Sequence, residues 1–82
     1  MRLDDFLSTV GLVKRRTVAK ELAANGRVEV NGRRVKPAYQ VRVHDIIRIG
    51  GSRPLAAEVL AVPAGSVPKE KRPEYVRQLP AG

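Results

Sequence analysis

The chain has 82 residues, which leaves room for one small domain. Folding at this length buries only about 60% of the surface that the unfolded chain exposes, so a deep catalytic cleft is not expected. Sixteen basic residues oppose eight acidic ones, a formal net charge of +8 that indicates a polyanionic partner. Most of the basic residues are arginine, which binds phosphate bidentately, and this bias favours a nucleic acid.

Several classes of protein are disfavoured by what the sequence lacks. Without cysteine and with His44 as the single histidine, neither a disulfide framework nor a thiolate or multi-histidine metal site is expected, and no cofactor is predicted. Asp4 and Asp5 stand where a signal peptide would begin its apolar region, and no stretch approaches the roughly 20 apolar residues of a membrane span. We therefore expect a cytoplasmic protein without a membrane partner. No nucleophile elbow or phosphate-binding loop occurs, so enzymatic activity is not expected.

Two helices are predicted at the start of the chain. The spacing i, i+3, i+4 and i+7 of four apolar residues predicts a short amphipathic helix that ends at Gly11. A second helix is predicted over residues 15–25, ending at Asn25-Gly26. The stripe of the first helix is Leu3, Phe6, Leu7 and Val10, and the inner face of the second is Val18, Ala19, Leu22 and Ala23.

Strands follow the helices. Residues 27–30 alternate as a strand does, Asn31-Gly32 is a strong hairpin signal, and residues 33–36 form the return strand before Pro37. Further strands are predicted over residues 46–50 and 56–62. Residues 63–82 contain four prolines and are expected to be mostly loop, with one short helix over residues 73–79. We therefore expect a domain over residues 1–62 and a proline-rich basic tail over residues 63–82.

The most distinctive feature is the run Lys14-Arg15-Arg16, followed by Lys20. The dipole of a helix disfavours cations near its N-terminus by roughly 0.3–1 kcal/mol each, and the sequence shows no compensation for these. Such a helix start favours phosphate binding over a merely solvated face. Arg27, Arg33, Arg34 and Lys36 flank the predicted hairpin turn and are expected to extend the same basic surface.

Aromatic residues are scarce: the sequence has only Phe6, Tyr39 and Tyr75. Modules that read unpaired bases need aromatic stacking platforms, so this chain is expected to recognise folded RNA through its backbone and shape. A DNA-binding helix-turn-helix remains an alternative, because two helices joined by a short turn also describe that motif. The basic residues open the second helix and continue onto a hairpin, which favours the RNA interpretation.

Three motifs together resemble the S4-type RNA-binding domain of ribosomal proteins. They are Arg2-Leu3-Asp4, the basic run from Lys14 to Leu22, and Gly26 to Gly32 with its pattern G-x-V-x-V-N-G, followed by Asp45 before a strand. The resemblance covers about residues 1–50. It implies an α+β fold in which two helices pack on a small, mostly antiparallel sheet, and in which the second helix and the hairpin bind structured RNA.

With no catalytic domain attached, the chain resembles the free-standing S4 proteins. Among these, residues 12–17 and the short basic tail look most like the members that stabilise P-site tRNA in ribosome quality control. That resemblance implies a monomer on obstructed large ribosomal subunits, with large-subunit rRNA, peptidyl-tRNA and the factor that tails stalled chains as partners. The small heat-shock S4 protein, which binds similar subunits, is the alternative within the family. Two departures stand out: His44 replaces a usual glycine, and Lys14 or Arg15 replaces a hydroxyl residue that would cap the second helix.

The sequence thus predicts a non-enzymatic RNA-binding protein. The candidate RNA contacts are Arg2, Lys14, Arg15, Arg16 and Lys20, with Arg27, Arg33 and Arg34 as secondary ones.

Overall fold

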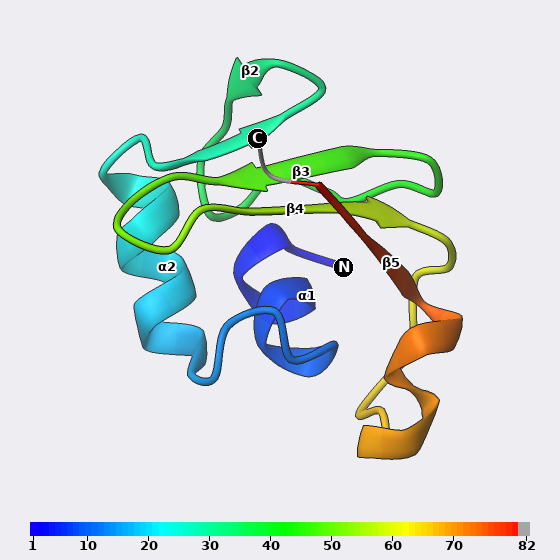
Figure 1. Cartoon of the computed structure of the whole chain (residues 1–82). Helices are drawn as coiled ribbons and strands as arrows, with labels where there is room; N and C mark the ends of the chain where they lie inside the picture. Colours follow the sequence, from blue (N-terminus) through cyan, green and yellow to red (C-terminus); the bar gives the residue numbers. More distant parts are fainter. Residues whose placement is uncertain (81–82) are drawn as a thin grey trace.

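The fold is a single antiparallel sheet with two helices on one of its faces (Figure 1). The computed structural model describes residues 1–80, in which the strand order is β2-β1-β3-β4-β5. This arrangement confirms the predicted α+β class. The elements are α1 (Leu3–Thr9), α2 (Arg16–Ala24), β1 (Val28–Val30), β2 (Arg33–Arg34), β3 (Ile46–Ile49), β4 (Leu55–Val59), the 3-10 helix η1 (Lys69–Glu74) and β5 (Val76–Leu79).

Helix α1 forms the centre of the core. Leu3, Phe6 and Leu7 are fully buried and Val10 is nearly so, which confirms the predicted apolar stripe. The inward residues of the sheet, among them Val28 and Ile47, complete this core from above. The helix ends at Thr9, and Gly11 then takes a φ of +77°, which reverses the chain toward α2.

Helix α2 packs through its small residues. Ala19 and Ala23 are buried, as predicted, and their small side chains let the helix lie close to α1. Leu22 is partly buried, but Val18 leaves 42% of its surface exposed, so the predicted inner face was wrong at this position. Neighbouring helical residues point about 100° apart, and tertiary packing placed the contact line on the alanines.

The predicted hairpin is present. Val30 pairs with Arg33, which leaves a two-residue turn in which Asn31 and Gly32 have φ values of 55° and 82°. Positive φ at both positions defines the type I′ turn that Asn-Gly favours. The return strand β2 covers only Arg33–Arg34, shorter than the predicted residues 33–36.

A buried carboxylate ties this hairpin to the rest of the sheet. Asp45, 6% exposed, accepts hydrogen bonds from Asn31 Nδ2 at 3.0 Å, the Tyr39 hydroxyl at 2.8 Å and the Arg42 N–H at 2.9 Å. Asn31 Oδ1 in turn accepts the Ile46 N–H at 2.9 Å. Burial alone would raise the pKa of Asp45, but these three donors outweigh it and lower the pKa below the usual 3.8.

The C-terminal segment differs from the prediction. No helix covers residues 73–79; the 3-10 helix lies earlier, over Lys69–Glu74, and Val76–Leu79 form β5. Strand β5 pairs antiparallel with β4, with Ala57 opposite Gln78, and so satisfies the backbone groups of the β4 edge. The Arg72 guanidinium lies against Gly11, where a Cβ atom would come within 2.5 Å of it. The segment is thereby packed onto the α1–α2 loop.

Asp45→Asn is expected to destabilise the fold at neutral pH by about 1–3 kcal/mol, because an amide group would face donors that now meet a carboxylate. The pKa of Asp45 is lowered in the folded state, so its contribution to stability is present above about pH 4 and is lost as the pH falls through the lowered pKa. Urea unfolding from pH 2 to pH 7 measures this. Between pH 7 and pH 2, the free energy of unfolding should fall less in Asp45→Asn than in wild type. Glu74→Gln, which changes an exposed carboxylate, should follow the wild-type curve. Parallel curves for Asp45→Asn and wild type would contradict the role of Asp45.

Candidate nucleic-acid interface

The predicted contact Arg2 is held by a fully buried carboxylate. Arg2 Nε lies 3.1 Å from Asp4 Oδ1, and Arg2 Nη2 lies 3.2 Å from Asp4 Oδ2, a bidentate arrangement. Asp4 has no exposed surface, and its Oδ1 also accepts the Asp5 N–H at 2.9 Å. The guanidinium is therefore oriented by a rigid partner while 41% of the Arg2 side chain stays exposed.

Arg16 is compensated in a way that the sequence did not show. Its Nε lies 2.8 Å from Asp5 Oδ1 and 3.8 Å from Asp4 Oδ2, so the acids of α1 offset a cation at the start of α2. The prediction of an uncompensated triplet is wrong for this residue. The ion pairs join α1 to α2, and 56% of the Arg16 side chain remains exposed.

Lys14, Arg15 and Lys20 are exposed and make no salt bridge within residues 1–80. Arg15 is the N-cap of α2 and forms no side-chain cap, and no acid occupies the first turn of that helix. The N-cap side chain of α2 thus does not replace the hydroxyl cap that is usual in the family. Arg2, Lys14, Arg15 and Arg16 together form what we call the helix-start cluster.

Two cations beside the hairpin turn, Arg27 and Arg34, lie near the other end of α2. The Arg34 side chain extends to the α2–β1 turn, where its Cδ is 3.4 Å from a Cβ built on Gly26. Arg27 points toward the β3–β4 loop, where its Nη1 would lie 3.6 Å from a Cβ atom on Gly51. Arg33 is in register with Val30 and Arg34 with Glu29, so the two arginines lie on opposite faces of the sheet. Arg27, Arg33 and Arg34 form the hairpin cluster.

The structure thus places seven of the eight predicted residues in two clusters instead of one patch. Helix α2 has nine residues, and at 1.5 Å per residue it separates the clusters by about 13 Å. Lys20 lies between them on the exposed side of the helix.

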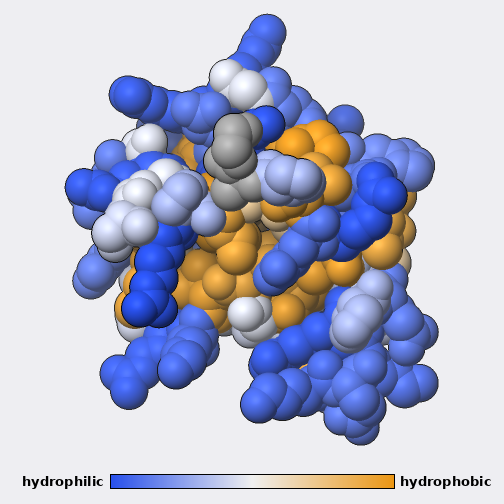
Figure 2. All heavy atoms as spheres, viewed as in Figure 1, coloured by the Kyte–Doolittle hydropathy of each residue, from blue (hydrophilic) through white to orange (hydrophobic). Residues whose placement is uncertain are grey.

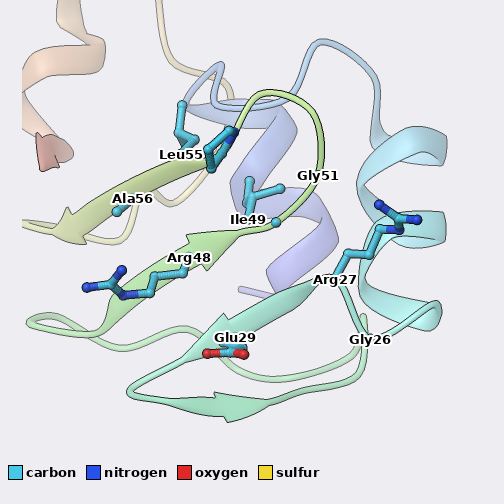
Figure 3. Close-up of a pocket in the computed structure, with 10 residues that line it drawn as sticks. Gly26, Arg27, Glu29, Arg48, Ile49, Gly51, Leu55 and Ala56 are labelled. Atoms are coloured by element: carbon cyan, nitrogen blue, oxygen red, sulfur yellow. The ribbon is translucent and has the colours of Figure 1, made fainter. Parts of the chain in front are cut away.

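Two further arginines near the hairpin cluster were not among the contacts predicted from the sequence. Arg48 on β3 is in register with Glu29, and Figure 3 shows it beside a hollow of about 350 Å³ that Arg27 and Gly51 also line. Arg53 lies in the β3–β4 loop, in the wall of a second groove that also includes Arg27. The alternation in β3 marks Arg48 as outward-facing, but its neighbours depend on strand register, which the sequence does not show.

His44 keeps the turn that a glycine would form. Its φ is 76°, in the left-handed region, and its N–H donates to the Val59 carbonyl oxygen at 2.8 Å. The imidazole is 84% exposed, with Nδ1 3.7 Å from Glu58 Oε2. The departure at His44 thus leaves the backbone before Asp45 intact.

Within the part of the chain that the structure describes, no group of three side chains could hold a metal ion, and no helix is long and apolar enough to cross a membrane. The features that remain are two basic clusters on a small α+β frame. This is the kind of surface that binds the backbone of a nucleic acid.

The S4 domain family model matches residues 1–47, and the chain belongs to this family. The RQC P-site tRNA stabilizing factor of Listeria innocua is 52% identical over 52 residues, a match that covers 61% of this chain. The same match spans 56% of that relative, little more than half of its length.

Two solved structures have the same fold. The solution structure of the hypothetical protein HP1423 is 33% identical, with a TM-score of 0.82 and 98% of each chain covered. Heat Shock Protein 15 of Vibrio cholerae has a TM-score of 0.87 at 22% identity, covering 96% of this chain and 81% of that one. The latter likeness is one of fold alone.

In the helix-start cluster, substitution of a cation paired with an acid is expected to lower the free energy of unfolding, whereas substitution of an exposed, unpaired cation is not. Arg2→Ala removes a bidentate partner of a buried carboxylate and should destabilise the fold by about 1–3 kcal/mol. Arg16→Ala removes a half-exposed ion pair and should destabilise it by about 1 kcal/mol or less. Arg15→Ala should leave the free energy of unfolding unchanged or raise it by up to about 1 kcal/mol, because the helix dipole disfavours a cation at this position. Chemical denaturation of the three variants measures this order, and a loss at Arg15 as large as that at Arg2 would contradict it.

Proposed function

We propose that this S4 domain binds folded RNA and acts by binding alone, through the helix-start and hairpin clusters. The observation that carries the proposal is the placement of the two clusters at opposite ends of α2, each joined to a buried aspartate network. Asp4 orients Arg2, and Asp45 holds the turn that separates β1 from the arginines of β2. Pre-oriented guanidinium groups lose less entropy when they bind phosphate.

The spacing of the clusters supports simultaneous contact with two RNA backbones. A domain this small gains little affinity from contact area, and engaging two RNAs raises the effective concentration of the second contact. The Listeria innocua relative is named RQC P-site tRNA stabilizing factor, a name that gives P-site tRNA as its ligand. We therefore infer that the two RNAs are large-subunit rRNA and the peptidyl-tRNA of an obstructed large ribosomal subunit.

In this proposal the protein is cytoplasmic and associated with ribosomes. It holds the tRNA while a separate tailing factor extends the stalled chain. Its own contribution is positional: exposed cations neutralise phosphates, and no bond of the substrate is made or broken.

Binding to a structured RNA is expected to fall steeply with salt. If about five phosphates are neutralised, the slope of log K against log salt should be about −4. The double substitution of Lys14 and Arg15 by alanine should reduce the magnitude of the slope by about one per lost contact without lowering stability. Lys71→Ala, an exposed residue on η1, is the matched control and should bind as wild type does.

Fluorescence anisotropy with an RNA hairpin, a DNA duplex of equal length and single-stranded RNA provides the comparison. Stronger binding to the DNA duplex would overturn the RNA assignment in favour of the helix-turn-helix interpretation.

On ribosomes, the protein is expected to sediment with large subunits that carry peptidyl-tRNA in preference to empty large subunits or intact ribosomes. The preference follows because only the obstructed subunit presents both RNAs to the two clusters. Purified subunits with and without peptidyl-tRNA, mixed with tagged protein at physiological salt, allow the measurement. Equal recovery with both would leave a general rRNA-binding protein and reject the role in tRNA stabilisation.

A further inference from the structure

An apolar groove lies between α2 and the β3–β4 loop, and the RNA-binding proposal does not use it. Its volume is about 530 Å³, within the range of roughly 300–1,000 Å³ that is common for binding pockets. Four segments contribute aliphatic side chains to its walls: the α1–α2 loop, α2, β3 and β4. These side chains are Leu12, Val13, Val18, Leu22, Ile49 and Leu55.

The exposure of Val18 marks the groove as an unfilled surface. Within residues 1–80, three large hydrophobic residues are exposed, and Val18 is one of them, with 42% of its surface exposed. It lies one helical turn before Leu22. Figure 2 shows apolar atoms also in the middle of the face drawn, over α1, surrounded by hydrophilic side chains. An apolar groove that charged side chains border is typical of an interaction site.

The charged side chains of the groove have one sign. Arg27 and Arg53 line it, and no acidic residue does so among the described residues. An occupant that places aliphatic side chains on the groove floor would thus have its flanks beside Arg27 and Arg53, which acidic flanks would complement.

The aliphatic lining favours a protein segment over an RNA base. Bases bind mainly by stacking on aromatic rings, and no aromatic residue lines the groove. Phe6 is fully buried in the core and Tyr39 donates its hydroxyl to Asp45, so neither can serve. Val18 and Leu22 are spaced i, i+4 and so lie on one face of α2, where they form an apolar wall. An apolar groove accepts the apolar face of an amphipathic helix.

We propose that this groove is a docking site for a partner protein, which inserts an amphipathic segment with aliphatic anchors and acidic flanks. The site is separate from the exposed cations Lys14 and Arg15 that the proposed RNA contact uses, although Arg27 borders both. A partner protein and an RNA could therefore occupy the domain together.

A synthetic peptide tests the proposal without knowledge of the natural partner. The probe is a fluorescent helical peptide with leucines at i, i+3, i+4 and i+7 and glutamates at both ends. A version with lysines in place of the glutamates and a version with serines in place of the leucines are the controls. We expect saturable binding of the first peptide only, with methyl resonances of Val18, Leu22 and Leu55 shifting in the NMR spectrum of the isotope-labelled protein.

Val18→Ser should weaken peptide binding by about tenfold, because it removes an apolar wall from the groove. Val43→Ser is the matched control: Val43 is 45% exposed, lies outside the groove and should leave peptide binding unchanged. Both residues are exposed, so both variants are expected to fold, and equal unfolding free energies would verify this. Both should also retain RNA binding, which separates this test from that of the proposed function.

Three results would overturn the proposal. The first is the absence of saturable binding or of shifts at the groove methyl groups. The second is an equal loss of peptide binding in Val18→Ser and Val43→Ser. The third is an RNA hairpin that displaces the peptide and shifts the same methyl groups, which would assign the groove to RNA.

Discussion

The carboxylate of Asp45 is the contact on which the arrangement of the sheet depends most. A buried carboxylate is tolerated only when hydrogen bonds replace its hydration, and three donors from separate parts of the chain do so here. One of them, Asn31, belongs to the hairpin turn, and its own carbonyl oxygen accepts the N–H of Ile46 on β3. Burial raises the pKa of Tyr39, with a further contribution from its hydrogen bond to Asp45, so its hydroxyl stays protonated as a donor. The position of the hairpin relative to β3 follows from this network.

Asp4 in α1 is a second buried carboxylate, and it lies where α1 meets the start of α2. In a chain with twice as many basic as acidic residues, Asp4 and Asp5 hold two of the cations, Arg2 and Arg16, against the helix pair. Both arginines remain partly exposed, so structural pairing and ligand contact are compatible in the same side chain. Substituting either arginine therefore lowers fold stability and also removes any RNA contact. Substituting Lys14 or Arg15, which make no salt bridge within residues 1–80, removes the RNA contact without lowering fold stability. This distinction matters for any experiment that reads RNA binding from charge removal.

Helix α2 separates two kinds of surface. Basic side chains lie near both of its ends, while Val18 and Leu22 form one wall of an apolar groove with the β3–β4 loop. The buried alanines, Ala19 and Ala23, keep the helix close to α1, so its larger side chains are left toward solvent and the groove. A short helix packed through small residues can thus present both a charged and an apolar face in a domain of this size.

The sequence by itself determined the local features: the apolar stripe of α1, the Asn31-Gly32 turn and the basic start of α2. Each follows from periodicity or turn chemistry within a few neighbouring residues. Tertiary structure alone decided that Val18 is exposed, that Asp5 pairs with Arg16, that Val76–Leu79 form a strand, and that Arg48 and Arg53 lie near Arg27. These depend on the distance and register between elements remote in the chain, which arise only when the core and the sheet edges are satisfied together.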